Sequence, residues 1–112
     1  MLKIEIGNTK REAGRLAAKK AAETLRTALL NHPKVRFTAA TGASQFEFLE
    51  YLCTIPSIDW NSMTMFHLDE YVGISEAHPA SFRKYLKDRL VFKVNPHEVF
   101  FIQGDNLDIN GE

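Results

Sequence analysis

The sequence predicts one α/β domain over residues 1–112, with a mainly parallel sheet between two layers of helices. Short apolar or alternating runs, which are typical of strands, take turns with longer segments whose apolar residues have helical spacing. This alternation favours parallel strands joined by right-handed crossovers, with helices on both faces of the sheet. With 112 residues, of which 45% are hydrophobic and 25% are charged, the chain can bury one small core.

The chain is expected to begin with a strand and a long helix. Residues 2–6 alternate between apolar and charged side chains, as a half-buried edge strand does. Thr9 and Glu12 then have the spacing of a capping box, in which a hydroxyl and a carboxylate satisfy free backbone N–H groups. The helix is expected to run to about Asn31, because its alanines and leucines fall along one stripe and a His-Pro pair follows.

A second strand over 35–40 and a second helix are joined by a loop of small residues, 41–44. Ser44 and Glu47 again have capping-box spacing, which predicts that the helix begins at Ser44 and runs to about Cys53. Cys53 is the only cysteine, so no disulfide can form within the chain. Its apolar neighbours favour a small buried side chain over a reactive thiol.

The second half of the chain is expected to add two strands and one helix. Residues 63–68 form a short apolar run that is typical of a buried strand. Pro79 suits the first turn of a helix that continues through Val91. Residues 99–102 are apolar throughout and predict a fourth strand. Only a polar, turn-rich tail follows, which suggests that the chain is an incomplete, N-terminal part of a larger domain.

Charge and composition argue against several classes of partner. The formal net charge is zero, whereas nucleic-acid binding needs a basic surface. Two basic clusters, at 10–11 and 83–89, are interleaved with acidic and apolar residues and are expected to be solvated helix faces. No apolar run approaches the roughly 20 residues that span a membrane, and the N-terminus lacks the apolar core of a signal peptide. These observations favour a cytoplasmic protein without a nucleic-acid or membrane partner.

The loop of residues 41–44 is a candidate phosphate site. It connects a strand to the start of a helix, where free N–H groups and the helix dipole favour an anion. Small residues let a phosphate approach the backbone, and Thr41 and Ser44 add hydroxyl donors. The alternative is a tight turn that carries an N-cap serine. The glycine spacing fits neither a P-loop nor a dinucleotide-binding fingerprint.

Asp69 and Glu70 directly follow a predicted buried strand, where two carboxylates are costly unless water, hydrogen bonds or a ligand satisfy them. Ligands of open α/β sheets bind outside the carboxyl ends of the strands. Adjacent residues point to opposite sides. One carboxylate is therefore expected to face the cleft while the other supports the loop or pairs with a cation, and an exposed turn is the alternative. A cleft carboxylate one strand away from a phosphate anchor indicates proton transfer on a small phosphorylated metabolite.

The histidines are expected to be structural. His67 lies inside the predicted strand 63–68, where a core or hydrogen-bonded histidine is expected rather than a general base. No metal site is predicted, because His67, Asp69, His78 and His97 lack a recognised ligand spacing.

Several stretches of the chain resemble glucosamine-6-phosphate deaminases. Residues 66–73, Phe-His-Leu-Asp-Glu-Tyr-Val-Gly, and the His-Pro-Ala-Ser-Phe of 78–82 are similar to a signature of that family. Residues 41–44 resemble its sugar-phosphate loop, and the Gln-Gly-Asp of 103–105 resembles the stretch after its next strand. The resemblance implies a three-layer, Rossmann-like fold of which this chain is the N-terminal portion. The related 6-phosphogluconolactonases share the fold but lack the Asp-Glu-Tyr-Val-Gly run.

The resemblance also implies an activity and a site. The family converts glucosamine 6-phosphate and water to fructose 6-phosphate and ammonia, without a cofactor. Asp69 would be the catalytic proton acceptor at the sugar C2, and Thr41, Gly42 and Ser44 would bind the substrate phosphate. Glu70 would complete the substrate-binding set in a supporting role. The expected protein is an enzyme of amino sugar metabolism, classed both as hydrolase and as isomerase, with homo-oligomerisation left open.

Two departures from the family leave alternatives open. Ala40 and Gln45 stand where the family's phosphate loop usually has prolines, and this could change the sugar that is accepted. The family also continues well past this length, with a further aspartate, a histidine and a glutamate in its later segment. A related sugar-phosphate isomerase and a non-catalytic or truncated sugar-phosphate-binding module are therefore the alternatives.

Overall fold

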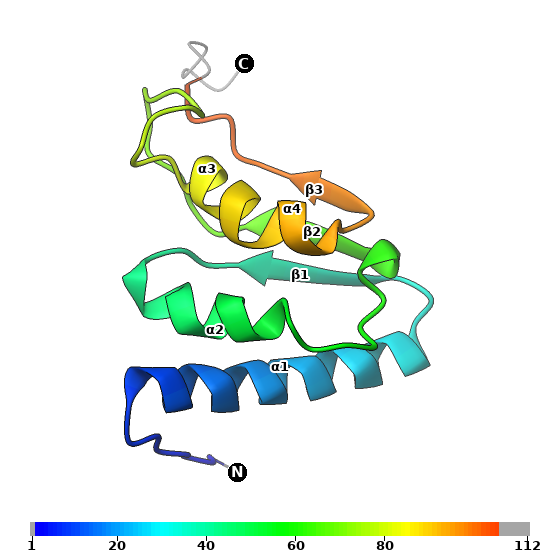
Figure 1. Ribbon diagram of the computed structural model, residues 1–112. Coiled ribbons are helices and arrows are strands. Elements are labelled where there is room, and N and C mark those ends of the chain that lie inside the picture. Colours follow the sequence, from blue (N-terminus) through cyan, green and yellow to red (C-terminus); the bar gives the residue numbers. More distant parts are fainter. Residues whose placement is uncertain (1, 106–112) are drawn as a thin grey trace.

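Three parallel strands form the sheet in the computed structural model, which describes residues 2–105 (Figure 1). The strands are β1 (Val35–Ala39), β2 (Met63–His67) and β3 (Glu98–Phe100), and β2 lies between the other two. Ala39 pairs with His67, and Phe66 pairs with Phe100. The carboxyl ends of all three strands therefore meet along one edge of the sheet. The predicted α/β class with a parallel sheet is confirmed.

The helices follow the strands in the expected alternation. Helix α1 precedes β1, α2 connects β1 to β2, and a broken helical segment connects β2 to β3. This last segment consists of α3, a π-helical turn and α4. The bounds are Lys10–Asn31 for α1, Phe46–Leu52 for α2, Phe82–Leu86 for α3, Lys87–Val91 for the π-helical turn and Phe92–Val94 for α4.

In the described residues the helices cover one face of the sheet only. On β2, Met63 and Met65 are fully buried, whereas Phe66 points the other way and is 38% exposed. Both crossovers step in the same direction along the sheet, and right-handed connections then place their helices on the same face. The second helical layer that was expected is not found in this part of the chain. The open face carries Phe66 stacked on Phe100, with ring centroids 5.3 Å apart.

The core lies between this sheet face and the helices. Helix α1 packs alongside α2, as Figure 1 shows. The contact is close because small residues face α2: Ala18 and Ala22 are buried, and a Cβ on Gly14 would lie 2.6 Å from that of Glu47. The buried apolar residues are Ala18, Ala22, Val35, Ala39, Leu49, Leu52, Ile58, Trp60, Met63, Met65, Leu86 and Leu90.

The strand predicted for residues 2–6 is wrong for the described structure. This segment has no strand conformation, and its three apolar side chains, Leu2, Ile4 and Ile6, are 85%, 73% and 83% exposed. Figure 1 shows it beside the beginning of α1, away from the sheet. Alternation alone predicted the strand, but none of the strands within residues 2–105 lies there to pair with it. The described sheet therefore has three strands rather than four.

One of the three predicted helix starts is confirmed. The Glu12 N–H donates to the Thr9 hydroxyl at 3.0 Å, and the Glu12 carboxylate accepts from the Asn8 N–H at 3.1 Å. The predicted serine cap at Ser44 is wrong, because Ala43–Gln45 form a 3-10 turn without a side-chain cap. Pro79 lies outside the helix that was predicted to begin with it, since the hydroxyl of Ser81 caps α3 instead.

Candidate functional site

The loop after β1, which contains residues 41–44, and the loop after β2, which contains Asp69, begin side by side at the carboxyl edge of the sheet. Ala39 and His67 are register partners at the ends of β1 and β2, and the Leu68 N–H donates to the Ala39 carbonyl at 3.1 Å. The loop 41–44 starts two residues after Ala39, and Asp69 lies two residues after His67. The predicted phosphate loop and the predicted proton acceptor are thus neighbours along this edge.

The loop 41–44 is anchored through its backbone. Gly42 has φ 117° and ψ 164°, a conformation that L side chains rarely adopt, which explains the glycine at this position. Its carbonyl accepts from the Tyr85 hydroxyl of α3 at 2.7 Å and from the Gln45 N–H at 3.0 Å. Thr41 is half-buried and Ser44 is exposed, and within the described residues neither hydroxyl makes a hydrogen bond. Both hydroxyls can therefore serve a ligand.

Asp69 is exposed, and in the described part of the chain its carboxylate makes no hydrogen bond or ion pair. Its neighbours on both sides are held: Leu68 bonds to β1, and Glu70 is locked into its own loop. The backbone at Asp69 is therefore held on both sides, while its carboxylate is free to meet a ligand. This arrangement suits a group that accepts a proton from a ligand.

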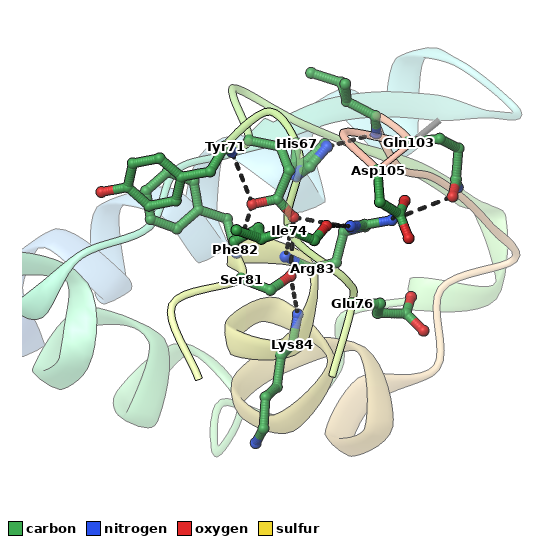
Figure 2. A network of polar contacts seen from close by, with 12 residues as sticks. His67, Tyr71, Ile74, Glu76, Ser81, Phe82, Arg83, Lys84, Gln103 and Asp105 are labelled. Atoms are coloured by element: carbon green, nitrogen blue, oxygen red, sulfur yellow. Dashed lines mark hydrogen bonds and ion pairs between the residues drawn. The ribbon is translucent and has the colours of Figure 1, made fainter. Parts of the chain in front are cut away.

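The carboxylate of Glu70 is completely buried and faces the interior of the protein. One oxygen accepts from the N–H groups of Tyr71 and Phe82, at 3.0 and 2.9 Å. The other accepts from the Ser81 hydroxyl at 2.9 Å, and from the backbone N–H and Nε of Arg83 at 3.1 and 2.9 Å. Figure 2 shows Ser81, Phe82 and Arg83, at the start of α3, within this network of polar contacts. The predicted contact of Glu70 with substrate stays a prediction, while its supporting role has a clear structural basis.

These contacts determine the charge of Glu70. Burial by itself raises the pKa of the Glu70 carboxyl, but the N–H groups of Phe82, Arg83 and Tyr71 and the Ser81 hydroxyl outweigh burial and lower this pKa to about 2. Glu70 is consequently an anion at neutral pH and forms a charged pair with Arg83.

Arg83 is a residue of this site that the sequence reading missed. Its side chain is 1% exposed, whereas the basic cluster 83–89 was expected to be a solvated helix face, so that expectation is wrong for Arg83. Its guanidinium donates to Glu70 at 2.9 Å, to Gln103 at 3.2 Å, to Asp105 at 3.0 Å and to the Ile74 carbonyl at 3.1 Å. The available signal was the pair of carboxylates at the strand end, one of which was expected to meet a cation.

The segment after β3 closes this network. The Gly73 N–H donates to the Gly104 carbonyl at 2.7 Å. Gly104 is buried so tightly that a Cβ there would lie 2.2 Å from the carbonyl oxygen of Tyr71. The glycine of the Gln-Gly-Asp stretch is therefore explained by the close approach of two backbone segments.

His67 is a structural residue, as predicted. It is 5% exposed, and its Nε2 accepts from the Ile102 N–H at 2.6 Å, which ties the end of β2 to the chain after β3. Burial lowers the pKa of the His67 imidazole, although the charge of Glu70 opposes this effect. Because Nε2 is an acceptor, the neutral ring carries its proton on Nδ1, which has no partner among the described atoms.

Over residues 2–105, no cluster of three or more His, Cys, Asp and Glu side chains is arranged to hold a metal ion. In the same part of the chain, no helix is long and apolar enough to cross a membrane.

Comparison with known proteins gives several relatives with one name, although no family model matches the chain. Glucosamine-6-phosphate deaminase 2 of Giardia intestinalis is 30% identical over 98 residues, which are 83% of this chain and 36% of that protein. The deaminase of Staphylococcus aureus strain MRSA252 is 33% identical over 79 residues, or 67% of this chain and 31% of that protein. Deaminase 2 of Bacillus subtilis is 39% identical over 51 residues, or 44% and 20%. The chain therefore spans about a third or less of these curated relatives.

Solved structures share the fold. A monomeric glucosamine-6-phosphate deaminase of the NagB superfamily superposes with a TM-score of 0.82 and 23% identity, over 97% of this chain and 46% of that one. A 6-phosphogluconolactonase from Shewanella baltica gives a TM-score of 0.75 at 18% identity, over 96% and 46%. The Rossmann-like fold is confirmed, with this chain as a part of the larger domain.

The comparisons confirm one expectation and correct another. The resemblance to the N-terminal portion of glucosamine-6-phosphate deaminases is confirmed, and the alternative of a non-catalytic module is not favoured. The expected classification as a hydrolase is wrong, because the relatives are named as deaminases, and that name conflicts with it. The supported description is an enzyme family of carbohydrate metabolism.

Proposed function

We propose that this chain, which is similar to the N-terminal portion of glucosamine-6-phosphate deaminases, supplies the proton acceptor and part of the phosphate site for converting glucosamine 6-phosphate to fructose 6-phosphate and ammonia. The observation that carries the proposal is the exposed carboxylate of Asp69 beside the loop 41–44, at the carboxyl edge of the sheet. The relatives' shared name supports the choice of substrate. A cytoplasmic location remains part of this proposal.

In the proposed reaction Asp69 removes the proton from C2 of the open-chain sugar. The electron pair of the broken C–H bond forms a C1–C2 double bond, and the aldehyde oxygen at C1 takes a proton from water, which leaves hydroxide. Return of the proton from Asp69 to C1 gives a protonated imine at C2. The hydroxide adds at C2, the C–N bond breaks, and ammonia leaves with the hydroxyl proton, so that the C2 ketone of fructose 6-phosphate remains.

The loop 41–44 is proposed to hold the phosphate. Thr41 and Ser44 offer hydroxyl donors, and Gly42, which has no side chain, leaves the backbone open to close approach. Fixing the phosphate would hold C2 against Asp69, and such orientation accounts for a large share of catalysis in reactions of this kind.

An ammonia-release assay on the full-length polypeptide tests this function. Wild type is expected to release ammonia from glucosamine 6-phosphate, and Asp69→Asn is expected to lower kcat by about 10²–10⁴-fold, the usual contribution of a general base. Asp88→Asn is the matched control, because Asp88 is an exposed carboxylate in an ion pair with Lys84. Turnover in Asp69→Asn equal to wild type would remove Asp69 from the mechanism, and a wild type without ammonia release would refute the function.

A further inference from the structure

Glu70, the residue after Asp69 in the chain, forms a buried ion pair with Arg83. We infer that this pair is a positioning device, which sets the Asp69 carboxylate at a fixed place relative to the phosphate loop. The inference rests on the proposed function. Neither residue of the pair is assigned a contact with substrate in this role, so both act through Asp69.

Stability alone does not account for such a pair. The side chains of Arg83 and Glu70 are 1% and 0% exposed. Burying two charges costs about as much as their attraction returns, and apolar residues of similar size often stabilise a fold equally well. What the pair provides is geometry, because a guanidinium and a carboxylate accept partners only in set directions. Here those directions join the loop after β2 to the first turn of α3.

The pair acts on Asp69 through one peptide unit. Asp69 lies between Leu68, which is bonded to β1, and Glu70, whose carboxylate takes five hydrogen bonds. Its own carboxylate makes no hydrogen bond or ion pair within residues 2–105 that could orient it. The direction of the Asp69 side chain therefore depends on the backbone on either side, and Glu70 controls one of these sides.

Helix α3 extends this control to the phosphate loop. Its first turn presents Ser81 and Arg83 to Glu70, and Tyr85, two residues after Arg83, donates to the Gly42 carbonyl at 2.7 Å. The same short helix thus holds both the backbone next to Asp69 and the loop 41–44. Displacing a reacting group by about 1 Å can cost about 10²-fold in rate, so such a connection has a direct effect on catalysis.

The test uses Glu70→Gln in the full-length polypeptide, with glucosamine 6-phosphate that carries hydrogen or deuterium at C2. Glutamine retains the shape but loses the charge and turns N–H groups toward the donors of Phe82 or Arg83. We expect kcat to fall about 10²-fold with KM little changed. We also expect a larger C2 isotope effect on kcat, because a displaced Asp69 makes proton removal more fully rate-limiting.

The isotope effect separates positioning from loss of structure. A variant that only unfolds in part has fewer active molecules, which lowers kcat but leaves the isotope effect of the remaining enzyme unchanged. Arg83→Lys provides a second variant, since it keeps the charge but loses the forked contacts to Ile74 and Gln103. Arg83→Lys is expected to show a smaller decrease in kcat and a smaller increase in the C2 isotope effect than Glu70→Gln. Lys84→Gln, in an exposed pair on the same helix, is the control and should match wild type.

The outcomes distinguish this inference from the proposed function. If wild type turns over glucosamine 6-phosphate but Glu70→Gln and Arg83→Lys keep its isotope effect, the positioning role is refuted and the function stands. If Glu70→Gln fails to fold, the isotope effect of Arg83→Lys decides in the same way. If wild type releases no ammonia, the function and the positioning role fall together.

Discussion

At the residue scale, the two adjacent carboxylates have opposite environments. Asp69 is exposed and free of partners in the described structure, whereas the Glu70 carboxylate is buried and saturated with donors. The contacts of Glu70 are those expected of a carboxylate that supports its loop and pairs with a cation. That Asp69 faces a substrate cleft stays a prediction. The cation that Glu70 meets, Arg83, lies 13 positions further along the chain, and local patterns do not predict a contact over that distance.

Gly104→Ala tests the close approach of Gly104 to Tyr71 and Glu70. A Cβ at this position would lie 2.2 Å from the Tyr71 carbonyl and 3.0 Å from Cγ of Glu70, so the backbone segments must separate. We expect a loss of about 1–3 kcal/mol in the free energy of unfolding, as overpacking typically costs.

Urea denaturation measures this effect, with Gly73→Ala as a comparison. Gly73 has open space around it but a φ of 86°, so its substitution reports backbone strain without a clash. A Gly104→Ala variant as stable as wild type would contradict the close packing of the two loops.

At the element scale, α3 is short but connects two loops of the site. Its cap, Ser81, also bonds to Glu70, and Tyr85 reaches the loop 41–44 from the same helix. The sequence predicted a helix in this region but placed its start at Pro79. Helix α3 begins at Phe82 and not at Pro79, because its first free N–H groups are satisfied by Ser81 and by the distant Glu70.

Tyr85→Phe tests the link between α3 and the loop 41–44. Loss of the hydroxyl leaves the Gly42 carbonyl with the Gln45 N–H as its partner, so the loop 41–44 is loosened and not freed. We expect KM for glucosamine 6-phosphate to rise more than kcat falls, and stability to fall by about 1 kcal/mol. Steady-state kinetics on the full-length protein measure the changes in KM and kcat separately.

Tyr51→Phe is the matched control, because the Tyr51 hydroxyl makes no hydrogen bond among the described residues. A Tyr85→Phe variant with unchanged KM would show that the link between α3 and the loop has no bearing on substrate binding.

At the scale of the whole molecule, the buried pair makes stability depend on pH. The pKa of Glu70 is lowered from 4.5 to about 2, so the unfolded chain takes up this proton at a higher pH than the folded one. The contribution of Glu70 to stability is therefore complete above about pH 4.5 and is lost as the pH falls toward 2. The lowered pKa of Asp105, held down by Arg83, acts in the same direction.

We expect the stability difference between wild type and Glu70→Gln to shrink as the pH falls through this range. Urea unfolding at intervals between pH 6 and about 2 measures it. Glu50→Gln, which removes a charge from an exposed pair with Arg11, is measured alongside as the control substitution. A difference that is constant over the whole range would mean that Glu70 has an ordinary pKa in the folded protein.

Much of the architecture was predictable because its signals are local. The long α1 with its Thr9 cap, the strands near 35–40 and 63–68, and the placement of Asp69 after a buried strand all follow from periodicity and cap spacing. Residues 2–6 show where such signals fail: alternation predicts a strand, yet a strand forms only where a neighbour pairs with it.

The order of the elements and the polar residues placed after each strand could be read from the amino-acid sequence alone. These are properties of short stretches, which hydrophobic spacing and turn residues encode directly. The folded chain was needed to show that Glu70 turns inward to Arg83 while Asp69 stays exposed, and that Gly104 lies against Tyr71. Those outcomes depend on contacts between segments that are distant in sequence and that meet only when the parallel strands bring their carboxyl ends to one edge.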